Sequence, residues 1–363
     1  MNILFIVPYV PNLIRVRPHN LVKFLAKRGH RVTLLTLWTD DNEREDLAQL
    51  REYCTHIEAM RLPRWRSVWN CLLAVPSRIP LQAVFCWHSG LAEKIKDLTV
   101  SPGGKPAYDV VHVEHLRGVR YGLYMRSLSR DIPIVWDSVD CISLLFRRAA
   151  IHSKKRLSRW LTRFELKRTE NYEGWLLDQF ERILVTSTAD GDALSALGGS
   201  RLNHCPVKVL PNGVDLDYFR PHTTERREPA TLVISGKMSY HANVTMTLHL
   251  VQSIMPMIWA KRPEVKLWIV GKDPSKEIQA LGAHPAITVT GTVDDIRPYL
   301  QKATIAVAPL TYGVGIQNKI LEALSCATPV ITTPQAVSAL EVMPGRDVLV
   351  AQDPGVFAEQ VLQ

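Results

Sequence analysis

The sequence predicts an α/β protein with two Rossmann-like domains, each built on a parallel β-sheet. Three observations support this prediction. Short apolar segments rich in β-branched residues alternate with longer helix-like stretches, which is the pattern of βα units. The alternation is interrupted by a turn signal, Pro211-Asn212-Gly213, after which a second series begins. A chain of 363 residues, 46% of them hydrophobic, is also long enough to form two compact cores.

Ten segments are predicted to be strands, five in each series. The first series comprises residues 3–7, 32–37, 110–113, 132–136 and 183–186. The second comprises residues 232–235, 266–270, 287–290, 305–308 and 329–332. We place the domain boundary near residue 200, giving domains 1–200 and 201–363. Two such domains are expected to face a central cleft, with ligands beyond the carboxyl ends of the strands.

The cysteines and the apolar segments bear on the cellular location. The six cysteines are scattered without the paired spacing of a disulfide framework or a zinc site, which favours reduced thiols in a cytoplasmic protein. The N-terminus has no basic leader and no small-residue cleavage site, and it is expected to form a strand rather than a signal peptide. The most apolar longer window, residues 67–87, is interrupted by polar residues and prolines, so no membrane span is expected.

The positive charge is concentrated in one segment. The chain has a formal net charge of +9, and residues 147–168 contain nine Lys or Arg residues against one acid, Glu165. With Trp160 and Phe164 interleaved, this segment could lie on an anionic membrane, assisted by residues 61–69 with their two tryptophans. A solvated charged helix explains the same residues. No nucleic-acid motif accompanies the charge, so no nucleic-acid partner is expected.

A loop and helix near residue 315 form the strongest candidate site. In a helix that begins near Gly315, the residues Gly315, Lys319 and Glu322 share one face, while the opposite face can pack on a sheet. Free amides at a helix start attract phosphate, and Lys319 adds a full positive charge one turn later. Glu322 could accept hydrogen bonds from ribose hydroxyls. A surface ion pair between Lys319 and Glu322 is the competing interpretation.

The motifs around this helix resemble those of glycosyltransferase family 4, a group of retaining enzymes with the GT-B fold. The similarity extends over most of the chain and is closest in the second half. The matching pieces there are Leu210-Pro-Asn-Gly-Val-Asp215, Ser235-Gly-Lys-Met238, Trp268-Ile-Val-Gly271, Gly291-Thr-Val-Asp-Asp295, Val307-Ala-Pro-Leu310, Asn318-Lys-Ile-Leu-Glu-Ala-Leu324 and Ala327-Thr-Pro-Val-Ile-Thr332. The first half fits through Pro8-Tyr-Val-Pro11, Leu25-Ala-Lys-Arg-Gly-His-Arg-Val-Thr33 and Tyr108-Asp-Val-Val-His-Val-Glu-His115.

The resemblance implies a function and a set of site residues. It implies transfer of a sugar from a nucleotide-diphosphate donor to a sugar or lipid-linked acceptor, with domain 1–200 on the acceptor side and domain 201–363 binding the donor. Lys237 and Lys319 would contact the diphosphate, Glu322 the ribose, and His115 the donor sugar. No metal or other cofactor is expected if these positive groups suffice. The other candidates for donor binding are Gly236, Asn243, Gly313, Gly315, Ile316, Arg15 and Arg17.

Three positions depart from the family pattern. Val314 stands where the family has a glutamate, and Asn243 replaces a basic residue. The glycine-rich first loop is here residues 11–18, in which Arg15 and Arg17 are expected either to replace the missing phosphate contacts or to be solvated loop charges. The family also continues beyond this point with a helix that returns to the first domain, so we expect a chain truncated at residue 363.

The acceptor side offers two acidic candidates. Asp137 and Asp140 follow a predicted strand and could orient or deprotonate an acceptor hydroxyl, although helix capping explains them more simply. Glu114, next to His115, is expected to be structural or solvated. Two other functions remain open at this point: a sugar-nucleotide-binding protein without transferase activity, and an epimerase of the nucleotide sugar with the same fold.

Overall fold

The structure is a computed structural model of the 363-residue chain. It describes residues 1–99, 107–152, 156–199, 205–221, 226–312 and 316–363, with only the backbone of residues 149–152 and 156–161. The chain forms two compact units, Met1–Pro211 and Asn212–Gln363, so the division follows Pro211 rather than residue 200. Within the described residues, no helix combines the length and apolar character needed to cross a bilayer.

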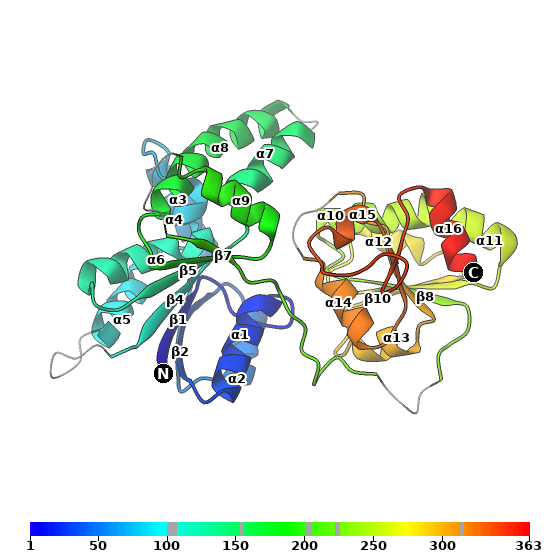
Figure 1. The fold of residues 1–363 in the computed structure, drawn as a ribbon, viewed down its shortest axis with the longest axis horizontal. Coiled ribbons are helices and arrows are strands. Elements are labelled where there is room, and N and C mark those ends of the chain that lie inside the picture. Colours follow the sequence, from blue (N-terminus) through cyan, green and yellow to red (C-terminus); the bar gives the residue numbers. More distant parts are fainter. Residues whose placement is uncertain (100–106, 153–155, 200–204, 222–225, 313–315) are drawn as a thin grey trace. The chain divides into compact units, whose positions relative to one another are not determined.

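The N-terminal unit is built on a seven-stranded parallel sheet in the order β3-β2-β1-β4-β5-β6-β7 (Figure 1). The strands are β1 Asn2–Val7, β2 Arg31–Trp38, β3 His56–Arg61, β4 Val110–Glu114, β5 Ile134–Val139, β6 Arg182–Val185 and β7 Val207–Val209. The helices are α1 Val16–Lys27, α2 Asp41–Leu50, α3 Arg64–Ala74, α4 Leu81–Phe85, α5 Ser89–Thr99, α6 His115–Leu128, α7 Ile142–His152, α8 Arg156–Leu176 and α9 Thr188–Ala196.

Side chains of β1 show why this sheet is buried on both faces. Ile3, Phe5 and Val7 pack in one apolar cluster, while Leu4 and Ile6 pack in another. Successive side chains of a strand point to opposite faces, so the two clusters lie on opposite sides of the sheet. A continuous apolar run of this kind is what a central parallel strand requires.

The C-terminal unit contains a six-stranded parallel sheet in the order β10-β9-β8-β11-β12-β13. The strands are β8 Thr231–Ser235, β9 Lys266–Val270, β10 Ile287–Gly291, β11 Ile305–Ala308, β12 Val330–Thr332 and β13 Leu349–Val350. The helices are α10 His241–His249, the π-helical turn η1 Leu250–Ile254, α11 Met255–Lys261, α12 Lys276–Leu281, α13 Arg297–Lys302, α14 Asn318–Ser325, α15 Pro334–Val337 and α16 Pro354–Leu362.

In each sheet the strand order reverses at one point, and this positions the candidate sites. β1 lies between β2 and β4, and β8 lies between β9 and β11. The connections on either side of such a point leave in opposite directions, which opens a crevice beyond the carboxyl ends of the strands. The loops after β1, β4, β8 and β11 are therefore where ligand-binding side chains are expected.

Candidate functional site

Two glycines bring the loops after β8 and β9 into close contact. Gly236 and Gly271 have φ angles of +142° and +150°, which favour glycine. A Cβ on Gly271 would lie 1.8 Å from the carbonyl oxygen of Gly236, and a Cβ on Gly236 would lie 2.7 Å from Nδ2 of Asn243. A side chain on Gly271 would therefore push these loops apart, and one on Gly236 would displace Asn243.

Asn243 of α10 connects the loop after β8 to α14. Its Nδ2 donates to the carbonyl oxygen of Lys237 at 3.0 Å, and its Oδ1 accepts from Nζ of Lys319 at 2.5 Å. One amide side chain thus holds Gly236, Lys237 and Lys319 together at the point where the strand order reverses. The loop after β8 and α10 are consecutive in the chain, whereas Lys319 is 76 positions from Asn243.

Lys319 and Glu322 are half-buried on the same side of α14, and both have shifted pKa values. Burial lowers the pKa of Lys319 to about 8, against the opposing effect of Glu322. Burial likewise raises the pKa of Glu322 to about 7, against the effect of Lys319. Poor solvation penalises the charged form of each group, and perturbed groups of this kind are concentrated at functional sites. A solvated surface ion pair does not account for these shifts or for the bond to Asn243.

The start of α14 differs from the expectation. The helix begins at Asn318, with Gln317 before it, rather than near Gly315. Gly313, Val314 and Gly315 lie outside the described residues, and Ile316 is half-buried. The Oδ1 atom of Asn318 is buried and has no hydrogen-bond partner in the part of the chain that the structure describes.

Lys237 is exposed to solvent, whereas Asn243 is buried and Lys319 is half-buried. Its side chain is 48% exposed, and its Nζ is 3.7 Å from Oδ2 of Asp273, whose own φ is +54°. An ion pair as exposed as this one contributes little to stability. Lys237 can therefore exchange Asp273 for another anion at small cost.

Three further residues were not selected from the sequence. Tyr312, which precedes α14, hydrogen-bonds through its hydroxyl to Nδ1 of His241 at 2.9 Å and to Oγ1 of Thr245 at 3.2 Å. The rings of Tyr312 and His241 are stacked. Because these residues are about 70 positions apart, spacing gives no signal for the contact.

Arg17 and Asp137 form a buried ion pair in the N-terminal unit. Nε of Arg17 donates to Oδ2 of Asp137 at 2.8 Å, and its Nη1 donates to the carbonyl oxygen of Leu210 at 2.8 Å. Arg17 was expected in a loop, but it lies in the first turn of α1 with 8% of its surface exposed, so a solvated loop charge is wrong. Nε2 of His112 is 3.7 Å from the same carboxylate, and burial lowers the pKa of His112 to about 4.

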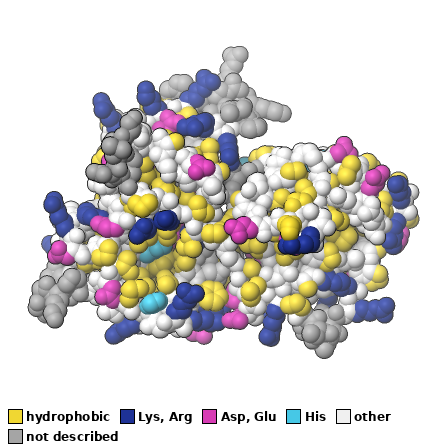
Figure 2. Space-filling view, in the orientation of Figure 1, with side chains coloured by type: hydrophobic (Ala, Val, Ile, Leu, Met, Phe, Trp, Pro, Cys, Tyr) yellow, Lys and Arg dark blue, Asp and Glu magenta, His cyan; other side chains and the backbone are white. Residues whose placement is uncertain are grey.

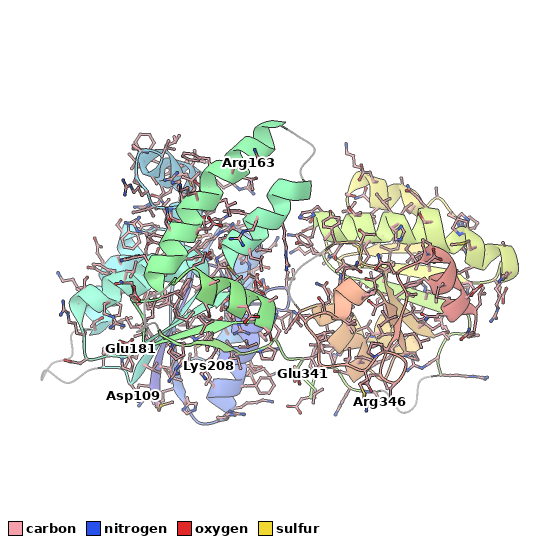
Figure 3. The ribbon with its side chains drawn as sticks, turned by 45° about the horizontal axis from the view of Figure 1, so that its top comes forward. Asp109, Arg163, Glu181, Lys208, Glu341 and Arg346 are labelled. Atoms are coloured by element: carbon pink, nitrogen blue, oxygen red, sulfur yellow. The ribbon has the colours of Figure 1, made fainter. Side chains whose placement is uncertain are left out.

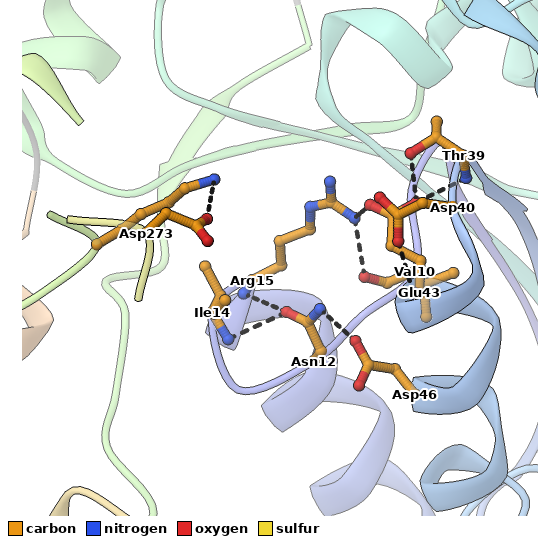
Figure 4. Close-up of polar contacts among 10 residues, drawn as sticks. Val10, Asn12, Ile14, Arg15, Thr39, Asp40, Glu43, Asp46 and Asp273 are labelled. Carbon is orange, nitrogen blue, oxygen red and sulfur yellow. Dashed lines mark hydrogen bonds and ion pairs between the residues drawn. The ribbon is translucent and has the colours of Figure 1, made fainter. Parts of the chain in front are cut away.

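Arg15 is more accessible than Arg17. Its Nη1 lies 2.7 Å from Oε1 of Glu43 and donates to the carbonyl oxygen of Val10 (Figure 4). Its guanidinium also lies 4.7 Å from the ring centre of Tyr9. Asn12 fixes the turn before it by accepting from the backbone amide of Arg15. Arg15 is thus held beyond the end of β1 with 36% of its side chain exposed.

Glu114 is buried rather than solvated. Its Oε1 accepts from the hydroxyl of Tyr9 at 2.7 Å, while its Oε2 is buried with no partner among the described residues. Burial raises the pKa of Glu114 to about 8, and the nearby charge of Asp137 adds to this effect. The side chain is therefore largely protonated at neutral pH.

His115 begins α6 in a strained conformation. Its φ is +61°, rare for a residue with a side chain, and its Nδ1 accepts from the backbone amide of Arg117 at 3.2 Å. Burial and the charge of Arg117 lower the pKa of His115 to about 3. The imidazole is thus neutral, with its proton on Nε2, and can donate a hydrogen bond. Strain of this kind is often retained at functional sites.

Asp137 and Asp140 do not cap α7, so the capping interpretation is wrong. Asp137 lies within β5. The amides of Ile142 and Ser143 at the start of α7 donate to Glu173 of α8 instead. Asp140 is half-buried, and burial together with Asp190 raises its pKa to about 6. Glu173, which the sequence did not reveal as a cap, lies some 30 residues away. Among the described residues, no three His, Cys, Asp or Glu side chains lie together as a metal site would need.

Comparisons with solved structures agree with the architecture. Anabaena HepE in complex with UDP and glucose is 15% identical, with a TM-score of 0.65 covering 99% of this chain and 89% of that one. A mutant of S. aureus TarM in complex with fondaparinux, alpha-GlcNAc-glycerol and UDP is 9% identical, with a TM-score of 0.62 over 100% and 92% of the two chains. A glycosyltransferase from Rickettsia africae is 13% identical, with a TM-score of 0.58 over 99% and 86%. These similarities confirm the predicted GT-B fold class.

Comparisons with protein families identify the chain. No curated protein matches the sequence. A family model described as Glycosyl transferases group 1 matches residues 229–363, and one described as Glycosyltransferase Family 4 matches residues 15–218. Because the second model alone covers more than half of the sequence, the chain belongs to glycosyltransferase family 4.

Proposed function

We propose that this protein transfers a sugar, with retention of anomeric configuration, from a nucleotide-diphosphate donor to an acceptor. Family membership supports glycosyl transfer, and the similar HepE structures hold UDP or UDP-glucose. The observation that carries the proposal is the group Asn243, Lys319 and Glu322, held at the strand reversal of the C-terminal sheet. That the transferred sugar is a hexose is a further part of the proposal.

The donor diphosphate is bound by Lys319 and Lys237 in this proposal. Breaking the bond between sugar and diphosphate leaves negative charge on the leaving group, so cations held there stabilise the transition state more than the ground state. Asn243 positions Lys319 through its Oδ1, and a bound phosphate would raise the lowered pKa of that lysine. Glu322 accepts hydrogen bonds from the ribose hydroxyls, and no metal is required.

Residues of the N-terminal unit serve the sugar and the acceptor. His115 donates a hydrogen bond from Nε2 to a sugar hydroxyl, a role that its lowered pKa favours because the ring stays neutral. Asp140, with a pKa of about 6, is suited to accept a proton from an acceptor hydroxyl, whereas Asp137 is already engaged in the buried ion pair with Arg17. Arg15 supplies a further positive charge for the donor, whereas Arg17 acts through Asp137.

The acceptor in this proposal is a growing polysaccharide or a lipid-linked sugar. The protein is expected in the cytoplasm, peripherally bound to the membrane through the basic residues of 147–168. Of these, Arg147, Arg148, Arg163 and Lys167 are exposed, whereas Arg168 is buried. Among the side chains that the structure describes, the segment thus has four exposed basic residues and one structural arginine.

Release of nucleoside diphosphate from a panel of UDP- and GDP-sugars tests the proposal. Lys319→Ala and Glu322→Ala are each expected to weaken binding of the active donor's nucleotide about tenfold or more, because each removes a charge-assisted contact. Lys261→Ala, which removes an exposed lysine from α11 of the same unit, is the matched control and should bind as wild type.

The outcomes separate the competing functions. Nucleotide binding without release, whatever the acceptor, would favour a non-catalytic binding protein. Conversion of the donor sugar to its epimer would favour an epimerase. Unchanged affinity in both Lys319→Ala and Glu322→Ala would remove the donor site from α14.

A further inference from the structure

Helix α3 exposes its large apolar side chains. Trp65 and Trp69 are 68% and 56% exposed, at positions i and i+4 of the helix. The other exposed apolar residues of this surface, which we call the α3 face, are Val68, Leu72, Leu73 and Val75. Together they form one apolar stripe along the helix, of the kind that normally faces a core.

The opposite side of α3 faces the protein with small and polar residues. Ser67 and Ala74 are buried, and Nδ2 of Asn70 donates to the carbonyl oxygen of Trp87 at 2.9 Å. The polarity of this helix is therefore reversed relative to that of an ordinary surface helix. Contiguous exposed apolar surface is costly in water and marks a surface that binds something.

The segment of chain that contains the α3 face carries only positive charge. Residues 59–92 contain no Asp or Glu and four arginines, Arg61, Arg64, Arg66 and Arg78. Three of these, Arg61, Arg64 and Arg78, are exposed. Tryptophan at the edge of an apolar surface with arginine around it is typical of segments that lie in the headgroup region of a membrane.

Arg168 fixes α3 to the basic surface of α8. Its Nη2 donates to the carbonyl oxygens of Ala74, Ser77 and Ile79, and its Nη1 donates to Glu165. The end of α3 is therefore attached to the same helix that exposes Arg163, labelled in Figure 3, and Lys167. In Figure 2, Lys and Arg side chains project from the upper part of this unit, where Figure 1 labels α3, α7 and α8.

We propose that the α3 face is a membrane-docking surface that inserts into the interface of a bilayer containing anionic phospholipid. The apolar stripe enters the headgroup boundary, and the arginines pair with lipid phosphates. This deepens the peripheral association proposed above by naming the inserting element, and it does not depend on sugar transfer. A second copy of this chain fits less well, because a symmetric contact would bring the exposed arginines Arg61, Arg64 and Arg78 of both copies together, from a segment that contains no acid.

Vesicle co-sedimentation of the full chain tests this proposal. Wild type should bind vesicles with about 30% phosphatidylglycerol in phosphatidylcholine, and bind phosphatidylcholine alone more weakly, because anionic lipid adds electrostatic attraction. Trp65→Ser with Trp69→Ser should weaken binding to both about tenfold or more. Arg61→Ser with Arg64→Ser should weaken only the binding to anionic vesicles. The difference from wild type should become smaller as salt is added, because salt screens the charges.

A matched tryptophan and two further readouts keep the test interpretable. Trp175→Ser removes a 42% exposed tryptophan at the other end of α8 and should leave vesicle binding unchanged. Each variant should keep the wild-type melting temperature and affinity for UDP, so that a failed donor site is distinguished from a failed membrane surface. The proposal is overturned if the Trp65 and Trp69 variant binds vesicles like wild type, if wild type binds none, or if wild type is a dimer that this variant makes monomeric.

Discussion

At the scale of single residues, Lys319 links the pKa values of the candidate site to donor binding. Burial holds its pKa near 8, so its positive charge is partly lost just above neutral pH. Only the protonated lysine attracts a diphosphate strongly. The affinity of this site for an anion must therefore depend on pH over an unusually low range for a lysine.

We expect the affinity of wild type for UDP to fall as pH rises from 7.5 to 9.5, approaching tenfold per pH unit above the pKa of about 8. Lys319→Arg should flatten this dependence, because a guanidinium stays charged over the whole range. Glu322, with a pKa of about 7, titrates in both proteins and cancels in the comparison. Isothermal titration calorimetry at several pH values gives the measurement, and parallel curves for the two proteins would contradict it.

Glu114 is expected to make the free energy of unfolding depend on pH. Its pKa in the folded protein is raised to about 8, so between pH 4.5 and 8 the folded state holds a proton that the unfolded chain has released. Its stabilising contribution is complete below pH 4.5 and is lost as pH rises through 8. Glu114→Gln keeps an acceptor for Tyr9 and cannot ionise near Asp137.

Thermal melts at pH 5, 6.5 and 8 should show similar melting temperatures for Glu114→Gln and wild type at pH 5. The variant should become more stable than wild type by pH 8. Glu173 and Asp140 also have raised pKa values, but they titrate in both proteins. A difference that does not change with pH would mean that Glu114 is not protonated in the folded state.

At the scale of elements, the buried strands were the predictable part. Every one of the ten segments predicted as strands overlaps a strand of the structure, and residues 266–270 and 305–308 coincide with β9 and β11. The strands β3, β7 and β13 were not predicted. β3 and β7 are the two edge strands of the N-terminal sheet, and β13 is an edge strand of the C-terminal sheet. Edge strands are shorter or only half-buried, so their sequences lack the continuous apolar run that identifies a central strand.

Contacts between elements that are distant in the sequence were not predictable, even where both partners were candidate site residues. Lys319 and Glu322 share a face of one helix, which a 3.6-residue period reveals. The bonds from Lys319 to Asn243 and from Arg17 to Asp137 join residues 76 and 120 positions apart. Such pairs depend on how the sheet orders its strands, and neither composition nor local spacing encodes that order.

Gly271→Ala tests the close approach of the loops after β8 and β9. The added Cβ would overlap the carbonyl oxygen of Gly236, and alanine disfavours a φ of +150°. We expect a loss of about 3 kcal/mol or more in the free energy of unfolding, from strain and overpacking together. Gly213→Ala, where a Cβ meets nothing within 4 Å, should change stability little. Equal urea midpoints for the two variants would argue against the close contact.

At the scale of the whole molecule, each unit has its own sheet and core. The largest apolar cluster draws all its residues from the C-terminal unit, and the other two draw theirs from the N-terminal unit. Gly236, Asn243, Lys319 and Glu322 all belong to the unit Asn212–Gln363. A chain of about 150 residues buries enough surface to fold alone.

A fragment of residues 212–363 is therefore expected to fold by itself and to bind UDP. In a thermal melt, saturating UDP should raise its melting temperature, since a ligand at about 100 times its dissociation constant stabilises the folded state by about 2.7 kcal/mol. Lys319→Ala in the fragment should reduce the shift, and a fragment of residues 1–211 should show none. If the full chain binds UDP more tightly than the fragment, the ratio of affinities measures what Arg15 and the rest of the N-terminal unit add. If the fragment 212–363 is folded but does not bind UDP, while the full chain does, the nucleotide site is not formed by α14 and its neighbours alone.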